Sequence, residues 1–345
     1  MRKIPDSLNA FIDGNSFFYV FGHVSPDGDC VGSCLAFAGF LKKLGKDCMI
    51  VAESKKDFYQ YKSKVDLCAG GSAYDVEVVG QFDFDSVASG KAKCVFLDCS
   101  GIERTGDIYL PFKDDTESLD VIRINSIRID HHPQGDCAVA SSYVDPDASS
   151  ASELVGEVIE SRIGFVDKYM CCALFFGIAS DTGFFRFSTG ANGSGTFQMC
   201  SRLVCAGVAP NVVGAVIDSG KDRDYVDYYT SLARNAEYLC GGKAVVVFDD
   251  VELYRRYTKA KRPSDDLYRL FLKISGVEAV VFVKCSEKEG YVDASVRVAA
   301  FSSFDANSFC MRFGGGGHVK AAGFHVSGVF DDVCGMVRRE LSRCF

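Results

Sequence analysis

The sequence predicts an α/β protein of two domains, the first built on a mostly parallel sheet. The chain has 345 residues, which is long for one domain and ordinary for two. In its first half, short apolar runs alternate with helical patterns, as in βαβ units. After Gly241 and Gly242 a second alternation of this kind begins. Apolar residues make up 48% and charged residues 24%, so we expect a folded protein throughout.

The first apolar run, Phe17–Phe21, predicts a buried strand that leads into a polar loop at residues 23–29. A helix is expected to follow at residues 32–44. Further strands are expected at residues 49–52, 94–97 and near 122–129. Ligands of parallel α/β sheets bind at the carboxyl ends of the strands, and polar clusters follow these runs directly.

The segment 209–240 differs from what precedes it, because it combines Pro210 with a charged run and an amphipathic pattern. We interpret it as a helical connector between domains at residues 1–208 and 241–345. In the second domain, strands are expected at residues 244–248, 280–283 and 292–298. A glycine run at 314–317 and a helix near 331–341 complete it.

The net charge bears on which partners the protein can bind, and the cysteines bear on the compartment in which it is found. The net charge is −8 and no basic block occurs, which argues against a duplex DNA partner. The sixteen cysteines form no C-x-x-C pair and lie mostly in apolar runs, as expected for buried thiols in a reducing cytoplasm. Asp6 and Asp13 interrupt any signal peptide, and no apolar stretch is long enough for a membrane span.

Four polar clusters each end an apolar segment: His23, Asp27 and Asp29; Asp98; Asp130, His131 and His132; and Asp181. Taken singly, each has an ordinary interpretation. An aspartate after a strand is usually a turn or a helix cap, and paired histidines are often surface residues. Their recurrence at the ends of successive segments of one domain instead predicts a common site at the carboxyl edge of the sheet.

A site with so many carboxylates is too negative to be buried without cations. Two divalent metal ions solve this problem, and mixed nitrogen and oxygen ligands suit Mn²⁺, Zn²⁺ or Fe²⁺ better than Ca²⁺. A pair of such ions can hold both the attacking and the leaving oxygen of a displacement at phosphorus. The residues therefore predict phosphoester hydrolysis.

The order H-x-x-x-D-x-D-x-x-G-S, then D, then D-H-H, then S-D-T-G resembles the DHH phosphoesterase superfamily over about residues 15–205. The resemblance implies a binuclear site for Mn²⁺ with the ligands His23, Asp27, Asp29, Asp98, His131 and Asp181.

The resemblance also implies a role for each position. His23 and Asp27 would hold one ion, and Asp98 would bridge both. Asp29, His131 and Asp181 would hold the second ion. The implied catalytic residues are Asp98, Asp130, which would orient the site, and His132, which would contact phosphate.

The second domain carries a G-G-G-H motif followed by A-A-G, which resembles the DHH-associated domain. Consecutive glycines allow backbone N–H groups to approach an anion, although a flexible turn has the same composition. The expected substrate-binding residues are Arg297, Gly315, Gly316, Gly317 and His318, at a cleft between the domains. His325, which lies in the following apolar run, is expected to be structural.

Compact members of this superfamily degrade very short RNA and remove the 3′ phosphate from phosphoadenosine phosphate. The segments 145–154 and 184–187 also resemble that branch. An alternative activity is a phosphodiesterase for cyclic di-AMP or its linear product pApA. A nucleotide-binding regulator without catalysis is a third interpretation, which the complete ligand set disfavours. The expected partner is thus a short RNA or small nucleotide, with no membrane and with a homodimer left open.

Overall fold

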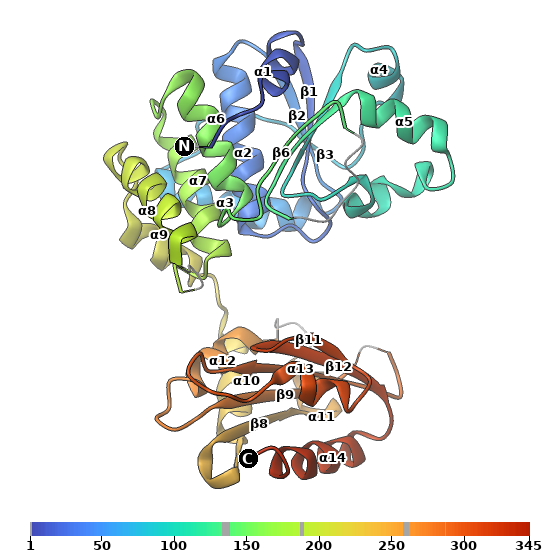
Figure 1. Ribbon diagram of the computed structural model, residues 1–345, viewed down its shortest axis with the longest axis vertical. Helices are drawn as coiled ribbons and strands as arrows, with labels where there is room; N and C mark the ends of the chain where they lie inside the picture. Colours follow the sequence, from blue (N-terminus) through green and yellow to red (C-terminus); the bar gives the residue numbers. More distant parts are fainter. Residues whose placement is uncertain (1, 133–138, 187–189, 258–261, 287) are drawn as a thin grey trace. The chain divides into compact units, whose positions relative to one another are not determined.

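The first unit of the structure is built on a six-stranded parallel sheet in the order β3-β2-β1-β4-β5-β6 (Figure 1). Its strands are β1 (Phe17–Phe21), β2 (Asp47–Val51), β3 (Val78–Val79), β4 (Lys93–Leu97), β5 (Ser126–Asp130) and β6 (Ser141–Val144). Strand order reverses between β1 and β4, which creates a topological switch point there. The predicted parallel α/β sheet is confirmed.

The computed structural model describes residues 2–132, 139–186, 190–257, 262–286 and 288–345. These divide into two compact units, Met1–Ser219 and Gly220–Phe345. The predicted connector at residues 209–240 is shared between them. Helix α9 (Pro210–Ile217) contacts the helices of the first unit, whereas α10 (Arg223–Arg234) packs on the second.

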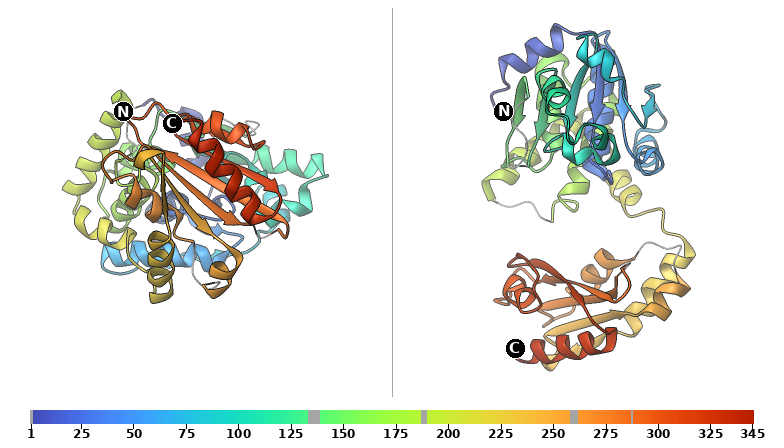
Figure 2. Two further views of the ribbon diagram at one scale, coloured as in Figure 1. Left: turned by 90° about the horizontal axis from the view of Figure 1, so that it is seen from below. Right: turned by 90° about the vertical axis from the view of Figure 1, so that its right-hand side faces the viewer.

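Helices cover both faces of the first sheet (Figure 2). One face packs on α1 (Asp6–Asp13), α2 (Gly28–Lys43), α3 (Lys55–Ala69), α6 (Ala151–Ile163) and α7 (Lys168–Asp181). The other packs on α4 (Phe84–Ala88), α5 (Thr116–Ile124) and the 3₁₀ segments Ile102–Ile108 and Leu110–Phe112. Helix α8 (Gly190–Cys205) packs on α7 and α6. The sheet is thus the middle of three layers.

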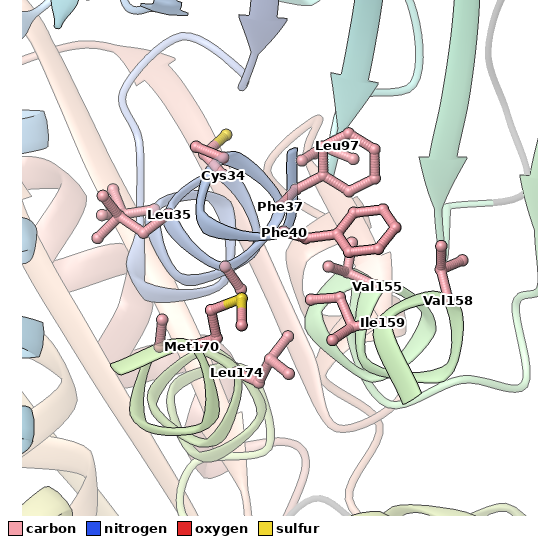
Figure 3. Close-up of a cluster of buried hydrophobic side chains, with 14 of the residues drawn as sticks. Cys34, Leu35, Phe37, Phe40, Leu97, Val155, Val158, Ile159, Met170 and Leu174 are labelled. Carbon is pink, nitrogen blue, oxygen red and sulfur yellow. The ribbon is translucent and has the colours of Figure 1, made fainter. Parts of the chain in front are cut away.

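The core between α2, α6 and α7 fixes where the ends of these helices lie (Figure 3). A Cβ atom added at Gly32 would lie 2.5 Å from the carbonyl oxygen of Ala173, and one at Gly177 would lie 2.0 Å from Ser152 Oγ. Only glycine permits this close approach. It brings the first turn of α2 beside the last turn of α7 and the start of α6.

Two expected element boundaries differ from the structure. The strand expected near 122–129 is wrong in its first part, because Ile122 belongs to α5, which the Asp115 side chain caps and which ends before Asn125. Helix α2 starts at Gly28 instead of residue 32, because the Asp27 side chain accepts hydrogen bonds from the backbone N–H groups of Asp29 and Cys30.

The second unit contains a mixed six-stranded sheet in the order β11-β12-β10-β9-β8-β7. Its strands are β7 (Glu237–Leu239), β8 (Ala244–Asp249), β9 (Ala279–Cys285), β10 (Tyr291–Val298), β11 (Gly316–His318) and β12 (Ala321–Ser327). One face packs on α13 (Ala306–Met311) and α14 (Phe330–Ser342). On the other face, α10 and α12 (Ser264–Phe271) cover β8 and β9. Helix α11 (Val251–Arg256) and the 3₁₀ turn Cys240–Gly242 complete the unit.

The cysteines in the described part of the chain are all free thiols, and most are buried. Within the same residues, no single helix is long and apolar enough to cross a membrane. One pair of helices, at residues 193–205 and 210–217, has the combined length and composition of a membrane span, but the two helices meet at a bend of 109°.

Candidate metal centre

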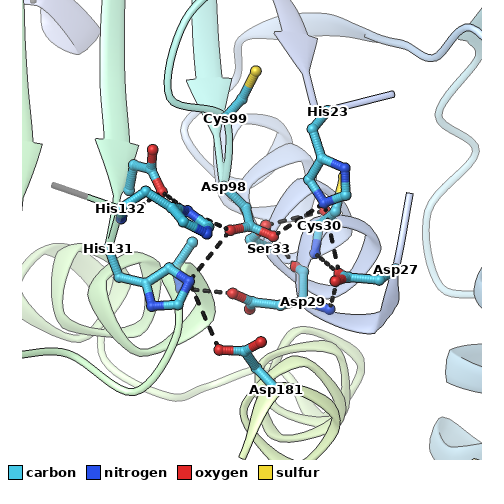
Figure 4. A network of polar contacts seen from close by, with 12 residues as sticks. His23, Asp27, Asp29, Cys30, Ser33, Asp98, Cys99, His131, His132 and Asp181 are labelled. Carbon is cyan, nitrogen blue, oxygen red and sulfur yellow. Dashed lines mark hydrogen bonds and ion pairs between the residues drawn. The ribbon is translucent and has the colours of Figure 1, made fainter. Parts of the chain in front are cut away.

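The carboxyl ends of three adjacent strands bring the predicted residues together (Figure 4). His23 and Asp27 follow β1, Asp98 follows β4, and Asp130 ends β5 just before His131 and His132. Asp181 was expected with them at a strand end, but it is the last residue of helix α7. The glycine contacts between α2 and α7 place it at the same edge.

One group of candidate ligands consists of His23, Asp27 and Asp98, whose ligand atoms all lie within 4.8 Å of one another. His23 Nε2 is 3.5 Å from Asp98 Oδ2 and 3.8 Å from Asp27 Oδ1. The other ring nitrogen, Nδ1, is 2.7 Å from the carbonyl oxygen of Val24 and is therefore its donor. This contact leaves Nε2 facing the carboxylates, as a metal ligand requires.

A second group consists of Asp29, His131 and Asp181, again with ligand atoms within 4.8 Å. His131 Nε2 lies 3.7 Å from Asp181 Oδ2 and 3.5 Å from Asp98 Oδ1. Asp98 therefore contacts a histidine of each group through a different carboxylate oxygen. These are the residues that the resemblance implies for two ions and a bridge, and their metal binding stays a prediction.

Asp98 has the features of a residue held in place for a ligand. Its side chain is 4% exposed, and its backbone has a φ of 50°, which non-glycine residues rarely adopt. Within the described residues, its Oδ1 atom is buried without a hydrogen-bond partner. A buried carboxylate oxygen that accepts no hydrogen bond is costly, and a cation between the two groups would satisfy it.

Asp29 is fixed by the start of helix α6. Its Oδ2 accepts a hydrogen bond from the backbone N–H of Ala151 at 2.7 Å, and its Oδ1 accepts one from Ser152 at 2.9 Å. Burial and the neighbouring charges of Asp98 and Asp181 still raise the pKa of Asp29 well above its usual value. The two N–H groups alone thus do not balance the charge of this buried carboxylate.

The histidine pKa values show that the site needs positive charge. Burial lowers the pKa of His23, but hydrogen bonds to Asp27 and Asp98 outweigh it and raise the pKa to about 12. His131 follows the same pattern: burial opposes Asp98 and its neighbours, and the pKa rises to about 9. For Asp181, burial is the main cause that raises the pKa to about 6. Divalent ions would supply the charge that protons supply in their absence.

Asp130 lies behind the two groups and holds His132. Its Oδ1 accepts hydrogen bonds from His132 Nδ1 at 2.8 Å and from the His132 backbone N–H at 3.1 Å. Arg128 donates to Asp130 Oδ2 from Nε at 3.1 Å and from Nη2 at 2.6 Å. Burial works against ionisation, but these donors lower the pKa of Asp130. His132 therefore keeps its proton on Nδ1 and leaves Nε2 available.

Arg128 was not predicted from the sequence. Its side chain is 1% exposed, and its Nη2 also donates to the carbonyl oxygen of His132 at 2.9 Å. The sequence did contain one indication of this role, because Arg128 is a charged residue within the predicted strand. It lies two residues before Asp130, so both side chains lie on one face of the sheet. The α6 N–H groups that hold Asp29 have no comparable signal, because they are backbone groups 122 or 123 residues away.

The raised histidine pKa values predict how metal-free protein responds to pH. His131 binds its proton more tightly when folded, so its stabilisation is complete below about pH 6.5 and is lost as pH rises through about 9. The melting temperature in chelator should fall over this range. Metal ions compete with these protons for the same side chains, so the increase in melting temperature caused by Mn²⁺ should become larger as pH rises.

Thermal denaturation from pH 6.5 to 9, with chelator and with Mn²⁺, measures both effects. The variant His131→Ala in chelator serves as the control, since it should show a weaker dependence on pH. A metal-free melting temperature that rises across this range would contradict the predicted proton binding.

The predicted substrate-binding residues lie in the second unit and share one face of its sheet. Arg297 and His318 are both opposite Ala321, on the two sides of β12. Arg297 packs its guanidinium over the Tyr268 ring at 5.2 Å, and its Nη1 donates to the Val296 carbonyl oxygen. His318 is exposed.

The glycine run was expected to be an open anion-binding loop, but it is hydrogen-bonded and closely packed within the second unit. The N–H groups of Gly314, Gly315 and Gly317 donate to Met311 O, Cys310 O and Asn307 Oδ1. A Cβ atom at Gly315 would lie 2.3 Å from the Gly323 carbonyl oxygen. Close packing on β12 thus accounts for these glycines, and three of the amides already have acceptors.

The sequence matches a known family over the part of the chain that carries the site. Residues 17–178 match the DHH family, N-terminal domain. The chain carries a DHH family domain. The match begins with β1 and contains every candidate ligand except Asp181, which lies just beyond it.

Two of the relatives with functional names are informative here. The bifunctional oligoribonuclease and PAP phosphatase NrnA of Thermus thermophilus is 25% identical, over 99% of this chain and 95% of its own length. The cyclic-di-AMP phosphodiesterase GdpP of Geobacillus thermodenitrificans is 28% identical over 95% of this chain, which spans 47% of that longer protein. Both hydrolyse phosphoester bonds, and the DHH protein is accordingly a phosphoester hydrolase.

A solved structure has a similar fold. The exopolyphosphatase-related protein of Bacteroides fragilis superposes with a TM-score of 0.72 at 20% identity, covering 98% of this chain and 95% of that one. At this identity the likeness extends to the fold alone.

Proposed function

We propose that the chain is a divalent-metal-dependent phosphoesterase that cleaves short oligoribonucleotides, 3′-phosphoadenosine 5′-phosphate, or both. The observation that carries the proposal is the pair of ligand groups joined by Asp98, whose buried Oδ1 has no hydrogen-bond partner among the described residues. The mixed imidazole and carboxylate donors suit Mn²⁺.

In this proposal His23 and Asp27 would hold one ion, Asp29, His131 and Asp181 would hold the other, and Asp98 would serve both. When bound, such ions supply Lewis-acid catalysis, lowering the pKa of a water molecule and withdrawing charge from phosphoryl oxygens.

His132 acts beside this centre. Its ring is 52% exposed and held through Nδ1, so its Nε2 is available to a phosphate oxygen. His132 is thus the expected phosphate contact, and Asp130 and Arg128 keep its ring in one orientation.

The substrate class is supported by the relative that matches over nearly its whole length, the NrnA of Thermus thermophilus. A second candidate is hydrolysis of cyclic di-AMP or pApA, supported by the 28% identity to GdpP. A regulator without catalysis is disfavoured, because every implied ligand position is filled. The acidic charge supports short single-stranded substrates over duplex DNA, and the free thiols support a cytoplasmic location.

A substrate panel tests the proposal. Purified protein is treated with chelator, supplied with Mn²⁺, Mg²⁺ or Zn²⁺, and assayed on 3′-phosphoadenosine 5′-phosphate, pApA, single-stranded RNA of increasing length and cyclic di-AMP. We expect no activity in chelator, best recovery with Mn²⁺, and rates that fall steeply with RNA length. Full activity without metal would refute the binuclear site, and preference for cyclic di-AMP would select the second candidate.

Substitutions in the second unit should affect substrate binding and leave the metals in place. His318→Ala and Arg297→Ala each remove a donor to phosphate, worth about 1.5–3 kcal/mol, so kcat/KM should fall roughly 10- to 150-fold. Neither residue belongs to the ligand groups, so bound Mn²⁺ should stay unchanged.

Metal analysis and steady-state kinetics on both variants measure the two quantities. Arg256→Ala, which alters an exposed arginine on α11, is the matched control and should behave like the unmodified protein. Loss of Mn²⁺ from His318→Ala would place that histidine at the metal site instead.

A further inference from the structure

One end of the polar sheet face in the second unit carries an ordered ring stack. His325 of β12 lies opposite Asp293 of β10, and its Nδ1 is 2.5 Å from Asp293 Oδ1. The Tyr291 ring stacks on His325 with 4.5 Å between centroids and 9° between planes. The Lys288 ammonium lies over the Tyr291 ring at 4.0 Å. The imidazole is therefore held in one orientation.

This arrangement differs from the structural histidine that the sequence predicted. The His325 side chain is 49% exposed, because strand alternation turns it away from the core that Phe324 and Val326 join. On this side of the sheet, the described core residues come from β8, β9, α10, α12 and the loop before β9, and none comes from β10, β12 or β11. His325 thus lies outside both cores.

The sheet register shows what lies beside the imidazole. Tyr291 precedes Asp293 by two residues, so it occupies the row on one side of His325. The row on the other side contains Ser295, Gly323 and Gly316, aligned across β10, β12 and β11. The Ser295 hydroxyl contacts Tyr268 at 2.6 Å, and the two glycines have no side chains. Next to the second face of His325, the sheet is therefore bare backbone at Gly323 and Gly316 only.

Arg297 and His318 occupy the row beyond, four residues from the row of His325. At about 3.4 Å per residue, the two rows lie roughly 13–14 Å apart on one face. The flat His325 ring thus lies at one end of a strip whose middle row on β12 and β11 consists of glycines, and Arg297 and His318 lie at the other end. Lys288 and Arg297 give this face two positive charges against the one carboxylate of Asp293.

We propose that His325, oriented by Asp293 and backed by Tyr291, is a stacking platform for a nucleobase of an oligonucleotide whose phosphodiester group is held by Arg297 and His318. This inference rests on the proposed function. It adds recognition of the nucleobase, which a site that binds phosphate alone does not contact. Stacking of bases on exposed rings tolerates any base, so the platform selects for a second nucleotide and not for sequence.

Histidine NMR tests the platform apart from catalysis, because the chain has five histidines. Histidine-labelled protein with diamagnetic Mg²⁺ is titrated with a phosphorothioate adenine dinucleotide and, separately, with ribose 5-phosphate. We expect ring-current shifts at His325 with the dinucleotide alone, and shifts at His318 with both ligands. Spectra of His325→Phe assign the signal. A His325 signal that stays unmoved while His318 shifts would overturn the platform.

Kinetics provide the second measurement. His325→Ala should raise KM for dinucleotides about 5- to 150-fold with kcat within about twofold, whereas His325→Phe, which keeps a flat ring, should stay near the unmodified protein. Both variants should keep the Mn²⁺ content and the circular dichroism of the unmodified protein. An equal rise in KM in His325→Ala and His325→Phe would show that a flat ring is not what His325 supplies, and would overturn the inference. If the unmodified protein hydrolyses nothing in the panel, the proposed function fails. If it turns over dinucleotides and His325→Ala does so with an unchanged KM, only the platform fails.

Discussion

Asp98→Asn should lower kcat by about 10⁴-fold or more, the largest loss that we expect from one substitution. The amide keeps the shape of the carboxylate but removes the charge that contacts both ligand groups. His23 and His131 each lie 3.5 Å from a different oxygen of Asp98, so the change weakens both halves of the site together. When residues act as one unit, loss of one member costs nearly as much as loss of all.

Metal-induced stabilisation separates this explanation from misfolding. Mn²⁺ should raise the melting temperature of the unmodified protein, because a ligand that binds only the folded state stabilises it. In Asp98→Asn most of that increase should be lost, while circular dichroism stays unchanged. Asp57→Asn, the same substitution at an exposed residue of α3, is the control. A well-folded Asp98→Asn with near-normal kcat would show that Asp98 only ends its strand.

The sequence was sufficient to predict the sheet and the part of the site that depends on it. Parallel strands need short, continuous apolar runs, and β1 and β4 are such runs. Because the carboxyl ends of adjacent strands share one edge, polar residues after them could be expected to meet. His23, Asp98 and His131 follow this rule, and Asp98 lies within contact distance of both histidines.

The remaining features depend on contacts that no local pattern encodes. Asp181 reaches the site from a helix, through packing at Gly32 and Gly177 that only the folded helices reveal. The run around Gly315 has the composition of an anion loop, yet residues of α13 accept hydrogen bonds from three of its amides and Gly315 packs closely on β12. His325 lies in an apolar run and is still exposed, because successive side chains of a strand point to opposite faces of the sheet. Composition alone could not distinguish these outcomes.

Arg128→Met should be the second most damaging change, lowering kcat by roughly 10²- to 10³-fold. Arg128 and Asp130 are 1% and 0% exposed, and loss of the arginine leaves the carboxylate buried without its ionic partner. Breaking such a pair costs about 3–5 kcal/mol of stability. The freed carboxylate would also no longer fix the His132 ring, so the effect should fall on kcat more than on KM.

A double variant separates the stability effect from the orientation of His132. Arg128→Met combined with Asp130→Asn removes both buried charges, so folding stability should recover, as it does when an entire buried pair is replaced. Activity should stay low, because the introduced amide would no longer present an ionised acceptor to His132 Nδ1, which lies 2.8 Å from Asp130 Oδ1 in the unmodified protein. Arg128→Lys keeps the charge but not the paired donors, so its kcat should lie between those of the unmodified protein and Arg128→Met. Recovery of full kcat in the double variant would mean that Arg128 serves stability alone, since His132 would then act without the carboxylate that orients it.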